Sequence, residues 1–233
     1  MIEKRVLRNA NTWGHLLMSK IERAIISCHD KTGLVELARF LEEFGVEIIS
    51  TAGTLKTLRD AGIAAVNMAD YVGMQEMMDG RVKSLHAKVH AGLLGLRDND
   101  LHCEQLEAAD YKWIDLAVIN LHPIAELLQK PHITLEEVIE QIDIGGATIL
   151  RSAAKNFRYV TVVVNPVRYS LLMHEMRAHD GEVSFPTRFR LAQEAFTCTA
   201  QYDQLIAHYL NQAAETMAGG SPFPDSGGQR TSP

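Results

Sequence analysis

The chain has 233 residues, and 46% of them are hydrophobic, which is enough to build a full core. Its net charge of −6 argues against a general binder of nucleic acids or anionic membranes. No apolar run approaches the roughly 18 residues that a membrane helix needs, and the first residues lack the apolar segment of a secretory signal. Cys28, Cys103 and Cys198 lack the spacing of a metal site or a disulfide framework. We therefore expect a cytoplasmic protein without a metal.

Short apolar segments alternate with segments of helical periodicity along most of the chain. Strands are expected at residues 23–27, 46–49, 64–66, 115–120 and 159–164, and helices at 34–44, 54–61, 147–155, 166–176 and 186–210. This alternation predicts a doubly wound, mostly parallel α/β sheet with extra helices at its C-terminal end. We expect an N-terminal extension at 1–21, one domain at 22–211 and a disordered Gly/Ser/Pro-rich tail at 212–233.

Polar residues follow several of the predicted strands. Right-handed crossovers would bring residues 27–31, 50–54 and 119–122 to one edge of the sheet. Residues 50–54 (Ser-Thr-Ala-Gly-Thr) lead directly into a helix, where backbone N–H groups and the helix dipole favour an anion. Such a turn also caps ordinary helices, so the signal is weak alone. The convergence of the strand ends predicts a ligand crevice at this edge.

The most basic stretch of the chain covers residues 80–92. It contains Arg81, Lys83, His86, Lys88 and His90, with apolar residues between them. Judged by charge alone, a solvated helix face is the favoured interpretation. A basic cluster on a packed segment of an acidic protein also fits a binding site for a small anion.

Several motifs in these segments resemble those of a known family. They are Asp30-Lys31-Thr32-Gly33, Gly80-Arg81-Val82-Lys83, Gln141-Ile142-Asp143-Ile144-Gly145-Gly146 and Ala153-Ala154-Lys155-Asn156. From about Arg23 to Leu210 the chain resembles the IMP cyclohydrolase domain of the bifunctional enzymes that also carry AICAR formyltransferase. The resemblance implies a methylglyoxal-synthase-like core and a homodimer. It also implies closure of the purine ring, in which 5-formamidoimidazole-4-carboxamide ribonucleotide (FAICAR) becomes inosine monophosphate (IMP) and water leaves. No cofactor is implied, and a separate formyltransferase is the implied partner.

The resemblance also assigns roles to individual residues. Lys83 would stabilise charge on oxygen, Lys155 would transfer protons, and Asp143 would orient the carboxamide. An ordinary alternative for Asp143 is a helix N-cap. The fourth catalytic position is His122. The implied substrate-binding positions are His29, Asp30, Lys31, Thr51, Ala52, Gly53, Thr54, Arg81, Val82, Ser84, Ile119, Asn120 and Ile144.

The chain departs from the family pattern at the expected site. His122 stands where a catalytic tyrosine is usual, and His29 stands where a serine is usual. A surface loop imidazole is an equally good interpretation of His122. These departures leave two alternatives to an IMP cyclohydrolase. One is a paralogue that cyclises a related carboxamide heterocycle nucleotide, and the other is a nucleotide-sensing regulatory module of the same fold.

Overall fold

The computed structural model describes residues 18–75, 77–82 and 84–217. The chain forms two compact units, so the single domain expected at 22–211 is divided. The described part of the first unit covers 18–122 and 143–199, and that of the second covers 123–142 and 200–217. Within the described ranges, no helix is both long and apolar enough to span a bilayer.

The first unit contains a five-stranded sheet in the order β4-β3-β2-β5-β6, and every neighbouring pair of strands is parallel. The predicted α/β fold with a mostly parallel sheet is therefore confirmed. The strands are β2 (Arg23–Cys28), β3 (Glu47–Ser50), β4 (Val66–Asn67), β5 (Leu116–Asn120) and β6 (Thr161–Val163). Ser27 pairs with Ile119 and Ile26 pairs with Ser50, so the ends of β2, β3 and β5 meet at one edge as expected.

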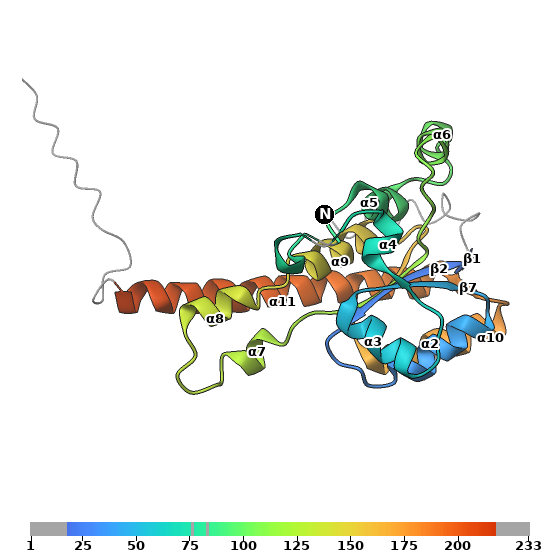
Figure 1. Cartoon of the computed structure of the whole chain (residues 1–233). Helices are drawn as coiled ribbons and strands as arrows, with labels where there is room; N and C mark the ends of the chain where they lie inside the picture. The colour runs from blue at the N-terminus through green and yellow to red at the C-terminus, as the bar shows by residue number, and fades with distance from the viewer. Residues whose placement is uncertain (1–17, 76, 83, 218–233) are drawn as a thin grey trace, which may run out of the picture. The chain divides into compact units, whose positions relative to one another are not determined.

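Both faces of this sheet are buried, because successive side chains on its strands enter different cores. Ala24 and Ile26 belong to one core, whereas Ile25 belongs to the other. Helices cover the two faces (Figure 1). The first core is covered by α2 (Leu34–Glu43), α3 (Ala52–Asp60) and α10 (Tyr169–Ala178), and the second by α4 (Met68–Val72), α5 (Ala87–Leu94) and α9 (Gly145–Lys155).

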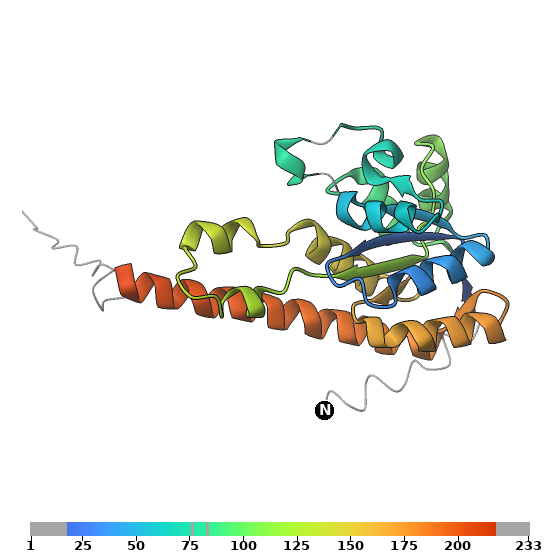
Figure 2. The ribbon, with the colours of Figure 1, turned by 60° about the horizontal axis from the view of Figure 1, so that its bottom comes forward.

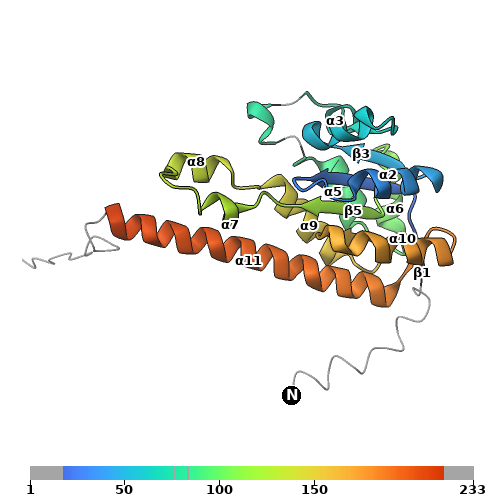
Figure 3. The same ribbon diagram turned by 90° about the horizontal axis from the view of Figure 1, so that it is seen from below.

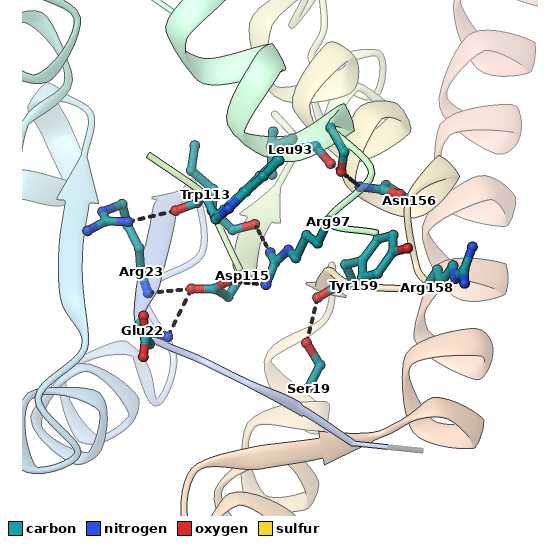
Figure 4. Close-up of polar contacts among 12 residues, drawn as sticks. Ser19, Glu22, Arg23, Leu93, Arg97, Trp113, Asp115, Asn156, Arg158 and Tyr159 are labelled. Carbon is teal, nitrogen blue, oxygen red and sulfur yellow. Dashed lines mark hydrogen bonds and ion pairs between the residues drawn. The ribbon is translucent and has the colours of Figure 1, made fainter. Parts of the chain in front are cut away.

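The amino edge of the sheet carries a polar network around Asp115 (Figure 4). The Asp115 carboxylate accepts hydrogen bonds from the backbone N–H groups of Glu22 and Arg23, at 2.9 and 2.8 Å. Its other oxygen pairs with the Arg97 guanidinium at 2.7 Å. The buried Asp115 carboxylate is thus matched by donors on both oxygens, and the arrangement fixes the entry to β2 and β5.

Short elements that the sequence pattern did not predict complete the unit. A two-stranded antiparallel ribbon joins β1 (Met18–Lys20) to β7 (Glu182–Ser184), so the fold begins inside the expected extension at 1–21. Residues 97–113 contain α6 (Asp100–Ala108), for which no helix was expected. The remaining short turns are η2 (Met78–Gly80) and η3 (Pro166–Arg168).

Arg188 is fully buried and joins separate segments of the first unit. Its guanidinium donates to the carbonyls of Phe157 and Arg158 at 3.0 and 2.9 Å, and to that of Val183. Burial is the main reason that its pKa falls to about 10. Because it ties the residues before β6 and those of β7 to one helix, its removal would leave several buried carbonyls without donors.

Arg188→Leu is therefore expected to lower the free energy of unfolding by about 3 kcal/mol, measured by urea denaturation. Arg190 is exposed on the same helix. The matched control Arg190→Leu should change the free energy of unfolding by less than about 0.5 kcal/mol. Equal effects of the two changes would contradict a structural role for the buried guanidinium.

The second unit contains α7 (Ile124–Leu127), α8 (Leu135–Glu140) and the later part of α11 (Phe185–Met217). Thr134 begins α8 with a capping box, in which its side chain and that of Glu137 each accept a backbone N–H of the other residue. Figure 2 shows α11 as one continuous helix. It continues to Met217, so the prediction of disorder from residue 212 is wrong for 212–217, and 218–233 lie outside the described residues.

A candidate active site at the carboxyl edge of the sheet

The Thr54 hydroxyl lies at the centre of the predicted anion site. It accepts a hydrogen bond from the Cys28 N–H at 2.9 Å and donates to the Cys28 carbonyl at 3.1 Å. The Lys31 ammonium donates to the same hydroxyl at 3.2 Å and also to the Cys28 carbonyl. The end of β2, the first turn of α3 and Lys31 are thereby joined, and we call Cys28, Lys31 and residues 51–54 the cradle.

The first turn of α3 supplies the backbone donors of the cradle. Ala52 and Gly53 begin the helix, and Thr51 is the residue before it. The first N–H groups of a helix have no partner within the helix, and they attract anions. The Thr51 hydroxyl is buried and lies 2.6 Å from the Ser27 hydroxyl, which holds the turn against the end of β2.

Asn120 at the end of β5 fixes the loop that follows β2. Its side-chain carbonyl accepts from the Asp30 N–H at 2.8 Å, and its amide donates to the Asp30 carbonyl at 3.3 Å. The Asp30 carboxylate in turn accepts from the Thr32 N–H at 2.8 Å. Hydrogen bonding from the Thr32 side chain, and next from its backbone N–H, lowers the pKa of Asp30. The hydrogen bonds of Asp30 and Asn120 therefore fix the shape of the loop after β2, and this loop places the Lys31 ammonium in the cradle.

His29 and His122 lie against each other beside the cradle. Their ring centroids are 4.6 Å apart, and the rings are tilted by 54°. The pKa of His122 is lowered from its usual value of 6.5, first by partial loss of contact with water and then by the neighbouring His29. The Asp143 carboxylate raises the pKa of His122, whereas the Lys31 ammonium lowers it further. At pH 7 the His122 ring is therefore mainly neutral.

Asp143 lies directly before α9 and near enough to His122 to act on its pKa. Its carboxylate accepts from the Gly146 N–H at 2.7 Å, so the ordinary role as a helix-start acceptor is present. A Cβ at Gly146 would overlap the carboxylate, and a Cβ at Gly145 would overlap the Ser84 hydroxyl. The paired glycines thus let Asp143 and the buried Ser84 approach the start of the same helix.

Several other predicted substrate-binding residues are not part of the cradle. Arg81 is exposed, Val82 is half-buried, and the Ile144 side chain is exposed at the start of α9. The Ile119 side chain lies in the second core, so this residue can meet a ligand only through its backbone. Lys83 lies outside the described residues.

Lys155 is not brought together with the cradle within one chain. It is the last residue of α9, whereas Asp143 lies just before the first residue. Eleven helical residues span about 16 Å. The helix ends at the amino edge of the sheet, since the Asn156 carbonyl accepts from the N–H of Val160, directly before β6. Asp143 and Lys155 of one chain therefore lie at opposite ends of α9.

Three contributions could not be assigned from the sequence. The backbone of Cys28 belongs to the cradle and the Ser27 hydroxyl supports it, but both residues lie in an apolar strand and only their position at its end signals a role. The third is Ser152, whose hydroxyl lies 3.0 Å from the His90 ring.

Comparison with known proteins shows which family this chain is similar to. The family model for the MGS-like domain matches residues 33–148, and that for the AICARFT/IMPCHase bienzyme matches 153–230. A bifunctional purine biosynthesis protein PurH from Neisseria meningitidis serogroup A is 48% identical over 205 residues. The match covers 88% of this chain and 39% of that protein. A PurH from Neisseria gonorrhoeae is 47% identical with the same coverage.

A solved structure agrees with these matches. The crystal structure of ForH superposes with a TM-score of 0.72 and 30% identity, covering 80% of this chain and 97% of that chain. The present chain spans about two fifths of the length of the PurH relatives it matches. The methylglyoxal-synthase-like fold, the cradle motifs and these relatives agree: the chain belongs to the AICARFT/IMPCHase bienzyme family and corresponds to its IMP cyclohydrolase half.

Proposed function

We propose that this chain is an IMP cyclohydrolase, which closes the ring of FAICAR to give IMP and water in purine biosynthesis. The observation that carries the proposal is the cradle, with Asp143 and His122 close beside it. The cradle offers a Lys31 ammonium and helix N–H groups to the ribonucleotide phosphate. A formyltransferase is the proposed partner, because FAICAR is itself the product of a formyl transfer.

Ring closure joins the carboxamide nitrogen to the formyl carbon, and a water molecule leaves. The carboxamide nitrogen and the formamide nitrogen each lose one proton, and the formyl oxygen gains both and leaves as water. Asp143 would accept a hydrogen bond from the carboxamide. The neutral His122 can donate one to the oxygen on which charge develops, in place of the usual tyrosine. Lys83 remains a proposed catalytic residue on the family resemblance.

A second copy of the chain would bring Lys155 to the site. Within one chain, Lys155 and Asp143 are separated by the length of α9, and a lysine side chain is too short to span about 16 Å. In a twofold dimer, each α9 can present Asp143 to its own cradle and Lys155 to the partner's. We therefore propose a homodimer in which each active site is shared.

An absorbance assay with FAICAR as the substrate tests the proposed function. Turnover to IMP is the expected result, and it should require no added metal or cofactor. Tight binding of IMP without turnover would contradict the proposal and favour a nucleotide sensor. Turnover of a different carboxamide heterocycle nucleotide at a much higher rate would favour the paralogue.

The rate of ring closure should depend on pH through His122. We expect the rate to rise as pH decreases through the lowered pKa of His122, with a midpoint below 6.5, and to be level above it, because the imidazolium is a stronger donor than the neutral ring to the oxygen on which charge develops. His122→Tyr should remove this acid limb, because a phenol does not titrate in that range. The substrate phosphate also titrates near pH 6, so the comparison is between the two proteins on the same substrate. An identical acid limb in both would contradict the role of His122.

A further inference from the structure

Helix α5 lies inside the basic stretch and packs along α9 (Figures 1 and 3). Its buried residues Val89 and Leu93 belong to the same core as Ile149 and Ala153 of α9. The two helices therefore share one apolar seam. The segment that leads into α5 contains Arg81 and Ser84, so the position of α5 determines where this segment lies.

Polar contacts fix α5 on α9 at defined points. The His90 Nδ1 lies 3.0 Å from the hydroxyl of Ser152, which is buried in α9. One turn further, the Asn156 amide donates to the carbonyls of Leu93 and Gly95, at 2.7 and 3.0 Å, as Figure 4 shows for Leu93. Apolar contacts allow helices to slide, whereas these bonds set the register between α5 and α9.

The His90 ring also lies beside the start of the segment that the site uses. Burial lowers the pKa of His90, and the nearby Ser84 carbonyl acts in the opposite direction. The Ser84 side chain is buried against Gly145, next to Asp143 and Gly146. Ser84 and His90 therefore lie on one segment, with Ser84 against the first turn of α9 and His90 against Ser152 further along the same helix.

We propose that His90 is a positioning residue: its contact with Ser152 fixes α5 on α9, which holds the preceding segment with Ser84 against Gly145 and keeps Asp143 aligned with the bound nucleotide. The proposal rests on the proposed cyclohydrolase function. The phosphate cradle is built from β2, Lys31 and α3, so it does not depend on this bridge. Loss of His90 should consequently affect the chemical step more than nucleotide binding.

The experiment compares His90→Ala, Ser152→Ala, the double variant and His90→Asn with the full-length wild type. Each protein is assayed for kcat and KM on FAICAR, IMP affinity by calorimetry and thermal stability. His90→Ala should lower kcat by up to about 10²-fold, since a displacement of about 1 Å at a reacting group can cost that much. IMP affinity should change less than about threefold.

The conservative and paired variants separate positioning from simple packing. His90→Asn retains a polar atom near the position of Nδ1 and should recover much of the lost kcat. The double variant should be no slower than His90→Ala, because both changes break the same contact. The control is His102→Ala, which removes an acceptor of the Leu96 N–H at α6 and should leave kcat unchanged.

A fall in thermal stability with unchanged kcat would overturn the proposal, and so would additive losses in the double variant. A wild-type protein that makes no IMP would contradict the proposed function instead. In that case, the rate of amide hydrogen exchange at residues 84–86 tests the positioning role of His90. Faster exchange in His90→Ala supports the positioning role, and exchange as slow as in the wild type overturns it.

Discussion

Mixing Lys155→Ala chains with Asp143→Asn chains is expected to restore about a quarter of the wild-type rate, because half of random dimers are mixed and each has one complete site. Each parent variant alone should be slower by about 10²–10⁴-fold, the usual cost of losing general acid–base help. The physical reason is the length of α9, which keeps Asp143 and Lys155 of one chain at opposite edges of the sheet. FAICAR turnover after co-expression of the two chains provides the measurement.

The control for this experiment is a pair of variants that damage the same cradle. Chains with Asp143→Asn and chains with His122→Ala each lack a group on the same side of the site. Their mixture should therefore not exceed the rates of the parents. Absence of recovery from the Lys155→Ala and Asp143→Asn mixture would show that Lys155 does not act across a dimer.

Lys31→Met is expected to weaken IMP binding by about 10²-fold, because it removes the cationic partner of the phosphate from the cradle. The Lys31 ammonium is held at the Thr54 hydroxyl and the Cys28 carbonyl, where the first turn of α3 begins. Titration calorimetry with IMP measures the affinity, and thermal melting checks that the fold is intact.

Lys56→Met provides the matched control for Lys31→Met. Lys56 lies on the same α3 helix but is exposed and pairs with Asp60, four residues away. Such a surface pair contributes little, and IMP affinity should be unchanged. Equal losses in the two variants would mean that general positive charge, rather than the cradle, binds the nucleotide.

The arrangement of the cradle could be predicted from the sequence because parallel strands impose it. Once 23–27, 46–49 and 115–120 are recognised as strands joined by helices, their polar ends must meet at one edge. The short ribbon of β1 and β7 could not be predicted, since three-residue strands carry no periodic pattern. The end of α11 could not be predicted either, because residues 211–217 (Asn-Gln-Ala-Ala-Glu-Thr-Met) can continue a helix without adding apolar periodicity.

The distance between Lys155 and Asp143 could be calculated from their spacing in the sequence. Twelve positions along a segment of helical pattern correspond to about 18 Å, well beyond the reach of one side chain. A resemblance to a family identifies residues without specifying which copy of the chain supplies them. The contribution of His90 was hidden for another reason, because its partner Ser152 lies 62 positions away.

The strand order has a consequence for how the protein is made. The central strand β2 has β3 on one side and β5 on the other, and residues 24–28 of β2 pair with residues 116–120 of β5. A growing chain on the ribosome can pair β2 with β3 early, but the other edge of β2 stays open until β5 has left the exit tunnel. During that interval an unpaired apolar edge is exposed to neighbouring chains. Synthesis that stalls before residue 116 should therefore give an aggregation-prone fragment that recruits chaperones, whereas a stall well beyond β5 should not.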